Sequence, residues 1–114
     1  MKLPRAIARA VEAVLDKKGE DVVALDLREA CAFTDYFLLV SATNQRQVVA
    51  VVDAVLETLR GLELRPNHVE GYPHREWILI DCGNFIVHVF TPRVREFYNL
   101  ERLWGQAPRK ELGQ

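Results

Sequence analysis

The order of apolar and polar positions along the chain predicts alternating helices and strands. Apolar residues recur at helical spacing between Leu3 and Leu15, with charged residues between them, and predict an amphipathic helix that ends near Gly19. The next two apolar segments, residues 22–27 and 36–42, are short and nearly continuous, which is typical of strands. The chain therefore opens with the predicted order helix, strand, strand.

A second helix is predicted where the spacing of apolar residues changes after the second strand. Asn44 can cap this helix, and Gly61 can end it. Its inner face carries four apolar residues, Val48, Val52, Val55 and Leu59. Because β-branched valines lower intrinsic helix stability, we expect packing to hold the helix in place. Residues 64–70 predict a third strand, which Pro66 makes short or confines to a sheet edge.

The strongest local signal is a β-hairpin near the end of the chain. Residues 77–82 and 85–91 are two apolar segments with strand character, and Gly83-Asn84 between them favours a tight two-residue turn. These segments add two strands to the three predicted above.

The remaining chain predicts short helical turns and a tail. Thr91-Pro92 favours the start of a short helix, and Asn99 can cap a further turn that reaches Trp104. Residues 105–114 are polar, and we expect them to form a mobile C-terminal tail. The elements together predict a single α/β domain over residues 1–104, with one mixed β-sheet of about five strands and helices packed on it.

The two faces of the predicted hairpin differ in character. With a two-residue turn, one face is wholly apolar and belongs to the core, since side chains alternate along a strand. The other face mixes apolar and polar side chains: Trp77, Leu79, Asp81, Ile86, His88 and Phe90. Either a terminal helix covers this face and Asp81 pairs diagonally with His88, or the face is open and binds a protein through its aromatic anchors. We favour the open face.

Composition and charge narrow the class of function. The chain has 114 residues, and fifteen Lys and Arg stand against sixteen Asp and Glu, which leaves a formal charge of −1. This balance argues against a domain that binds nucleic acid by neutralising many phosphates. Cys31 and Cys82 are too few for a disulfide framework, and the N-terminus lacks the features of a signal peptide. We therefore expect a cytoplasmic protein with reduced thiols and no membrane association.

Catalytic motifs are missing from the sequence. The three histidines lack zinc-like spacing, no glycine-rich phosphate loop occurs, and no Asp-x-Asp pair suits two-metal chemistry. We predict a binding protein that is not an enzyme and needs no cofactor or metal. An enzyme and an RNA-binding protein stay open as alternatives. Arg93 and Arg95 beside Phe97 and Tyr98 form the nearest candidate for an RNA contact.

Eight short segments follow one another along the chain: Thr34-Asp35-Tyr36-Phe37, Arg46-Gln47-Val48, His68-Val69-Glu70-Gly71, Trp77-Ile78-Leu79-Ile80-Asp81, Gly83-Asn84, Val87-His88-Val89-Phe90, Arg95-Glu96-Phe97-Tyr98 and Leu100-Glu101-Arg102-Leu103-Trp104. In this order they resemble the RsfS/Iojap family of ribosomal silencing factors, and the resemblance covers roughly residues 3–104.

The resemblance implies a nucleotidyltransferase-like fold without catalytic carboxylates. It also implies a translation repressor that binds the large ribosomal subunit through ribosomal protein L-fourteen, sterically blocks joining of the small subunit and damps translation under nutrient limitation. The partner-binding residues expected from the hairpin face and the resemblance are Trp77, Leu79, Asp81, Ile86, His88, Phe90, Tyr98 and Leu100. A ribosome assembly factor with a minor ribosomal RNA contact and a nucleotidyltransferase-related enzyme stay open as alternatives to this implied role. Whether residues 98–104 cover the hairpin face or extend it stays open, as does the choice between a monomer and a homodimer.

Overall fold

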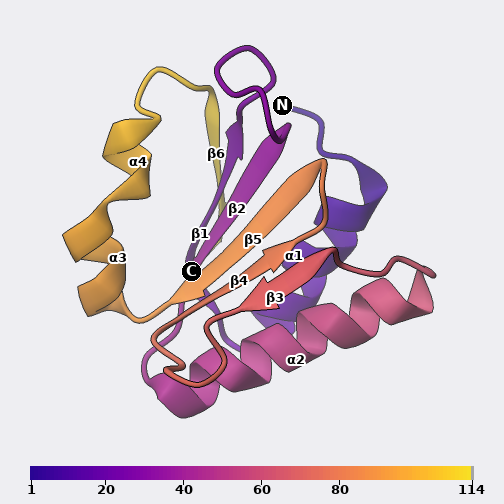
Figure 1. The fold of residues 1–114 in the computed structure, drawn as a ribbon, viewed down its shortest axis with the longest axis vertical. Coiled ribbons are helices and arrows are strands. Elements are labelled where there is room, and N and C mark those ends of the chain that lie inside the picture. Colours follow the sequence, from indigo (N-terminus) through magenta and orange to yellow (C-terminus); the bar gives the residue numbers. More distant parts are fainter. Residues whose placement is uncertain (114) are drawn as a thin grey trace.

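The computed structural model describes residues 1–113 and contains one mixed β-sheet with helices on both faces (Figure 1). In chain order the elements are α1 (Arg5–Asp16), β1 (Glu20–Asp26), β2 (Tyr36–Ser41), α2 (Gln45–Gly61), β3 (His68–Glu70), β4 (Trp77–Asp81), β5 (Phe85–Phe90), α3 (Pro92–Tyr98), α4 (Leu100–Leu103) and β6 (Arg109–Gly113). The sheet has six strands in the order β3-β4-β5-β2-β1-β6, where about five were expected. The α/β class, with helices packed on one mixed sheet, is confirmed.

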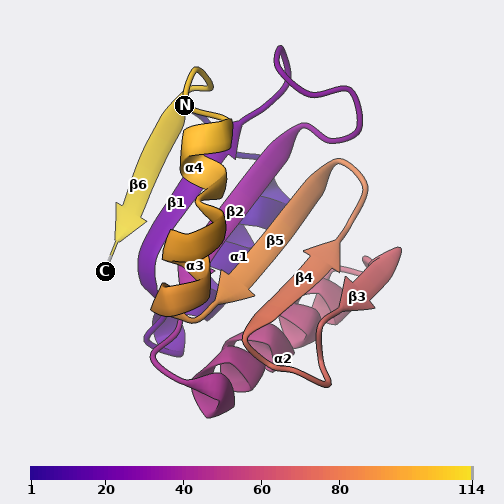
Figure 2. The ribbon, with the colours of Figure 1, turned by 60° about the vertical axis from the view of Figure 1, so that its left-hand side comes forward.

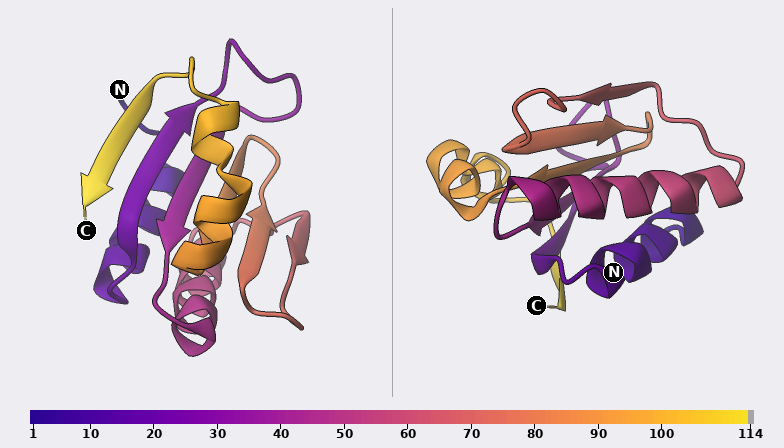
Figure 3. Two further views of the ribbon diagram at one scale, coloured as in Figure 1. Left: turned by 90° about the vertical axis from the view of Figure 1, so that its left-hand side faces the viewer. Right: turned by 90° about the horizontal axis from the view of Figure 1, so that it is seen from below.

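The centre of the sheet is the pairing of β2 with β5, which is parallel, whereas the other described pairs are antiparallel. The chain crosses from β2 to β5 through α2, the short edge strand β3 and β4. As predicted, the third strand is short and lies at an edge. The crossover places α2 against one face of the sheet, beside α1 (Figure 3).

The helix α2 follows the predicted capping and burial pattern. The Asn44 side chain accepts a hydrogen bond from the backbone N–H of Gln47 at 2.9 Å, and the Gln47 side chain accepts one from the Thr43 N–H at 2.6 Å. These reciprocal bonds satisfy two donors at the start of the helix. The stripe Val48, Val52, Val55 and Leu59 is fully buried, together with Val51. The helix is therefore held by packing on the sheet, as its β-branched composition requires.

The opposite face of the sheet is covered in part by a second layer, which we call the C-terminal hook (residues 92–104). The hook contains α3 and α4 and lies over the middle of the sheet, while β4 and β3 stay uncovered on this side (Figure 2). Asn99, in a left-handed conformation, separates the two helices and caps α4 through the Arg102 N–H. Trp104 packs edge-on against Phe37 of β2, with ring centroids 6.1 Å apart.

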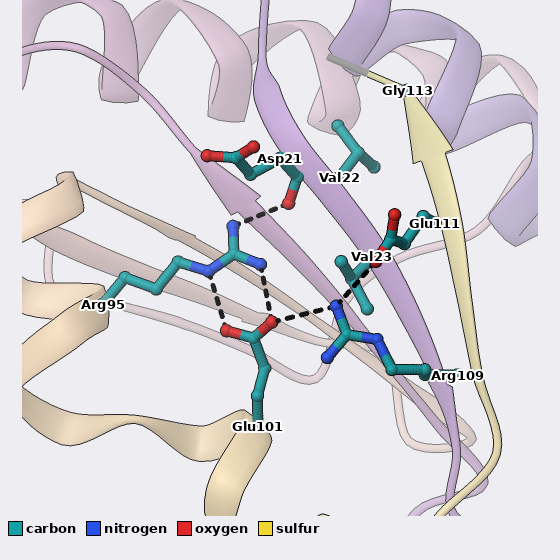
Figure 4. Close-up of a pocket in the computed structure, with 8 residues that line it drawn as sticks. All are labelled: Asp21, Val22, Val23, Arg95, Glu101, Arg109, Glu111 and Gly113. Carbon is teal, nitrogen blue, oxygen red and sulfur yellow. Dashed lines mark hydrogen bonds and ion pairs between the residues drawn. The ribbon is translucent and has the colours of Figure 1, made fainter.

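An ion pair between the buried Arg95 and the half-buried Glu101 fixes the hook on the sheet (Figure 4). Arg95 donates to both carboxylate oxygens of Glu101, from Nε at 3.0 Å and from Nη2 at 3.2 Å. Its Nη1 donates to the backbone carbonyl of Asp21 at 2.7 Å and to Ser41 Oγ at 2.9 Å. Asp21 lies at a register shift in β1, where bulged backbone groups leave the ladder. We call this arrangement the Arg95 latch; Glu101 extends it to Arg109 of β6 at 3.5 Å.

The structure differs from the expected mobile tail over residues 105–114 at residues 109–113. Residues 109–113 form β6, which pairs antiparallel with β1. Its side chains are exposed except for the half-buried Leu112, so backbone hydrogen bonds and the contact of Arg109 with Glu101 hold it. A strand with charged residues at a sheet edge is a common way to limit edge-to-edge association, and it lacks the apolar pattern that reveals a strand.

We predict that Glu101→Gln lowers the free energy of unfolding by about 2 kcal/mol at neutral pH, because the buried Arg95 guanidinium loses its carboxylate partner. The hydrogen bond from Arg95 holds the pKa of Glu101 below its usual value. The carboxylate therefore stabilises the fold above its unfolded-state pKa, and this contribution is lost as the pH falls through the lower folded-state pKa. Denaturant unfolding at about pH 7 and about pH 3 measures the difference. An equal deficit of the variant at both pH values would contradict the latch.

Candidate functional site

The hairpin has the register that its turn predicts. In the β4–β5 pair, Trp77 lies opposite Phe90, Leu79 opposite His88 and Asp81 opposite Ile86. The alternate residues of both strands belong to the core between the sheet and the helices α1 and α2. The mixed face, which sequence reasoning singled out as the candidate binding surface, is thus one real face of the sheet.

The expectation that this whole face is open was wrong for its β5 half. Ile86, His88 and Phe90 are buried, with exposed fractions of 6%, 4% and 0%, because the hook lies over β5. The β4 residues Trp77 and Leu79 are half-buried at the edge of the hook. The covered-face alternative therefore applies to one strand and the open-face alternative to the other.

The diagonal pair of Asp81 with His88 does not form. Asp81 Oδ1 accepts a hydrogen bond from the backbone N–H of Gly83 at 2.8 Å, which ties the carboxylate to the hairpin turn. His88 instead accepts a hydrogen bond at Nδ1 from the indole Nε1 of Trp77, at 3.1 Å. Both polar groups of the mixed face therefore have a structural contact within the hairpin.

Residues 98–104 cover one part of the hairpin face and extend another part. Trp104 and the half-buried Leu100 pack onto the sheet and cover it. Tyr98 extends the open part of the face: its side chain is 55% exposed, and its ring lies 4.9 Å from that of Trp77. The hook therefore closes the β5 half of the face and adds an aromatic side chain beside the β4 half.

Trp77 is the centre of an aromatic cluster that joins the core to the surface. Its ring lies 5.7 Å from Phe90 and 5.9 Å from His88 on the inner side, and next to Tyr98 on the outer side. Phe97 packs edge-on against Tyr98 at 5.0 Å and is itself 79% exposed. Large aromatic side chains held this way contribute strongly to protein interfaces, because little conformational freedom is lost on binding.

These aromatics border a shallow groove of about 380 Å³ between the hook and the loop before β4. We call it the aromatic groove; its lining consists of Gly71, His74, Glu76, Trp77, Arg93, Val94, Phe97 and Tyr98. The ion pair of Arg93 with Glu76 bridges the hook and the strand end at its rim. Gly71 has a φ of +98°, and a Cβ there would collide with the Trp77 carbonyl oxygen, so only glycine fits this close approach.

Phe97 and Val94 were not among the expected binding residues. Their positions carry a signal, however, because residues 94, 97 and 98 share one side of a helix that starts at Pro92. Leu103, which is 70% exposed on α4, was also not among the expected residues. The spacing places these α3 side chains on one side of the helix, but an apolar stripe of this kind usually faces the core, so spacing alone does not indicate that Phe97 and Tyr98 are exposed.

The remaining candidate chemistry is sparse. Among residues 1–113, no three His, Cys, Asp or Glu side chains gather as metal ligands would. Burial raises the pKa of the Cys82 thiol to about 11, which keeps it protonated and a poor nucleophile. Within the described residues, no helix combines the length and the apolar character needed to cross a membrane.

Burial also lowers the pKa of His88, to about 3. A free imidazole has a pKa of about 6.5. At pH values between the folded and the unfolded pKa, His88 therefore binds a proton in the unfolded chain but not in the native protein. We therefore predict that stability falls as the pH drops from about 6.5 towards 3, by up to about 1.4 kcal/mol per pH unit. Thermal unfolding of the wild type and His88→Leu across this range tests it. The variant should lose this part of the slope, and identical slopes would contradict the assignment.

Comparison with known proteins gives a consistent result. A family model described as "Ribosomal silencing factor during starvation" matches residues 1–114. A protein from Halalkalibacterium halodurans named ribosomal silencing factor RsfS is 41% identical over 103 residues, which cover 90% of this chain and 88% of the relative. A Mus musculus protein named "Mitochondrial assembly of ribosomal large subunit protein 1" is 28% identical over 97 residues, which cover 82% of this chain and 42% of the relative.

A solved crystal structure shares the fold of this chain. The crystal structure of a protein from Chromobacterium violaceum matches with a TM-score of 0.87 and 32% identity, covering 100% of this chain and 89% of that one. The family match over the full chain and the similarity to several ribosomal silencing factors lead to one conclusion. This chain belongs to the RsfS family of ribosomal silencing factors.

Proposed function

We propose that this protein represses translation by binding the large ribosomal subunit through its aromatic groove and blocking the small subunit from joining. Ribosomal protein L-fourteen is the proposed contact. The observation that carries the proposal is the open aromatic cluster of Trp77, Phe97 and Tyr98, supported by the family of silencing factors to which the chain belongs. The proposed setting is the cytoplasm, where the factor acts when nutrients are limited.

The groove suits a protein partner better than RNA. Its centre is aromatic, and the charged groups Glu76 and Arg93 pair with each other at the rim. A hydrophobic centre with a polar rim is the usual anatomy of a protein–protein interface. The formal charge of −1 supplies no general attraction to phosphate, so a ribosomal RNA contact would be minor.

Blocking by occupancy requires size and position, and it requires no turnover. The molecule measures 34 × 34 × 24 Å, which is enough to keep two surfaces apart when it is seated between them. Leu79 and Asp81 continue the surface from the groove along the uncovered strand β4. In this proposal Ile86, His88, Phe90 and Leu100 support the surface from beneath, and Trp77 and Tyr98 contact the partner.

A second candidate function is assistance in large-subunit assembly. The name of the mouse relative supports it, since that protein is named for mitochondrial assembly of the large ribosomal subunit. Assembly and silencing can use the same docking surface on the same subunit. A third candidate is a nucleotidyltransferase-related enzyme on a nucleotidyltransferase-like fold. Calorimetry with nucleotide and Mg²⁺ tests it, and Mg²⁺-dependent nucleotide binding would favour it over a pure binding protein.

Gradient sedimentation of purified subunits tests the function. With this protein present, we expect fewer joined ribosomes, and we expect the protein to sediment with the large subunit. Unchanged joining despite normal binding to the large subunit would favour the assembly role. The accompanying readout for assembly is accumulation of immature large subunits in cells depleted of the protein.

The exposed Phe97 gives a clean test of the aromatic groove, and Phe33 provides a matched control. Both side chains are largely exposed, at 79% and 66%, but Phe33 lies in the loop between β1 and β2, away from the groove lining. Phe97→Ala should weaken binding to the large subunit about thirtyfold, the loss of about 2 kcal/mol typical of an aromatic hot spot. Phe33→Ala should bind like the wild type. Equal affinities for the two variants would place the interface elsewhere.

Trp77→Ala should abolish co-sedimentation while the chain stays folded, because the indole is the central anchor of the groove. Circular dichroism and unfolding midpoints of the variant provide the folding control. Wild-type binding by folded Trp77→Ala would contradict the assignment of the anchor.

A further inference from the structure

His88 is a polar side chain in an apolar place. It lies on β5 under the hook with 4% of its surface exposed, and its ring contacts those of Phe37, Trp77 and Phe90. In the sheet, His88 lies opposite Leu79 of β4 on one side and opposite Leu39 of β2 on the other. These apolar surroundings are typical of a position that holds a leucine or phenylalanine.

The hydrogen bonding of the ring is one-sided. The Trp77 indole N–H donates to Nδ1 at 3.1 Å, so Nδ1 is unprotonated and the neutral ring carries its proton on Nε2. Nε2 is buried and has no hydrogen-bond partner among residues 1–113. A buried N–H without an acceptor costs stability, which an apolar side chain of similar shape would avoid. Packing alone therefore gives no reason for a histidine here.

What a histidine supplies, and a leucine cannot, is an acceptor fixed beneath the indole. Trp77 lies at the boundary between covered and open sheet, where its ring packs against Phe90 on the inner side and against Tyr98 on the outer side. The bond to His88 is the hydrogen bond that the indole N–H makes within the described residues. Its loss would free the indole to adopt other rotamers at the groove.

We propose that His88 is a positioning residue for partner binding, which holds the Trp77 indole in the orientation that the aromatic groove presents. This role rests on the proposed function, since it requires that Trp77 contacts the large subunit. His88 itself touches no partner, because the hook and the neighbouring strands enclose it. The binding surface is thereby ordered before the partner arrives, which lowers the entropy lost on association.

Two replacements of similar shape separate packing from hydrogen bonding. His88→Leu removes the acceptor, and His88→Asn keeps a polar oxygen near the position of Nδ1. NMR of the free protein reads out the bond directly through the Trp77 indole N–H, assigned with the help of Trp104→Phe. The wild type and His88→Asn should show slow exchange of this proton with solvent, and His88→Leu fast exchange. Equally slow exchange in His88→Leu would overturn the proposal.

Binding to purified large subunits supplies the second readout. His88→Leu should weaken binding about tenfold without lowering the unfolding midpoint, and His88→Asn should recover most of that loss. In a Trp77→Phe background, which lacks the indole donor, His88→Leu should have no further effect. An equal tenfold loss in both backgrounds would mean that His88 does not act through Trp77, and would overturn the proposal.

The wild-type measurement separates this proposal from the proposed function. If the wild-type protein fails to bind large subunits, the proposed function fails, and this role of His88 fails with it. If the wild type binds and Trp77→Ala does not, the proposed function stands. Wild-type affinity of His88→Leu in that case would overturn the positioning role alone.

Discussion

The position of the hook depends on one buried guanidinium. Arg95 reaches from α3 to the Asp21 carbonyl and to Ser41 on the sheet, while its other nitrogens hold Glu101 of α4. Helices of seven and four residues have almost no stability of their own, so contacts to the sheet must fix them. A partly buried charge tolerates few arrangements, because each alternative leaves it without partners. The latch therefore sets where the hook ends and where the open aromatic surface begins.

Burial and exposure along β4 and β5 follow from this placement. The same sheet face is core under the hook and surface beside it, and Trp77 spans the boundary with one edge on Phe90 and the other on Tyr98. A small domain gains from such an arrangement, because a side chain at this boundary is partly exposed and is also supported by the core. The cost is a buried histidine whose Nε2 lacks a partner within the described residues.

Most of the fold was predicted from short sequence patterns, because caps, turns and apolar stripes depend on residues that are close in the chain. Asn44 capped α2, the Val and Leu stripe was buried, and Gly83-Asn84 set the hairpin register. Strand β6 escaped prediction because backbone pairing holds it and its charged side chains carry no apolar pattern. The exposure of the mixed face was predicted only in part, since no local rule tells which strands a short helix will cover, even one that directly follows β5.

The polar contacts of the face show the same limit at the level of single residues. His88 has two diagonal neighbours on β4, Trp77 and Asp81. From the sequence, the opposite charges of a carboxylate and an imidazolium favoured a pair with Asp81. The Asp81 carboxylate lies beside the turn and accepts a hydrogen bond from the Gly83 N–H. His88 therefore pairs with the Trp77 indole instead. Competition between a local and a cross-strand partner decides such pairs, and it depends on distances that spacing along the chain does not contain.

The parallel pairing of β2 with β5 also orders the assembly of the molecule in time. The pair joins residues as far apart as Tyr36 and Phe85, and contacts of this span form slowly because a long loop must close first. The β4–β5 hairpin is local and can form early, with its mixed face bare. The latch needs Ser41 and Asp21, so the hook docks only after the N-terminal half is in place. We infer that the aromatic groove is completed late in folding, because partially folded chains lack the docked hook that forms one of its sides.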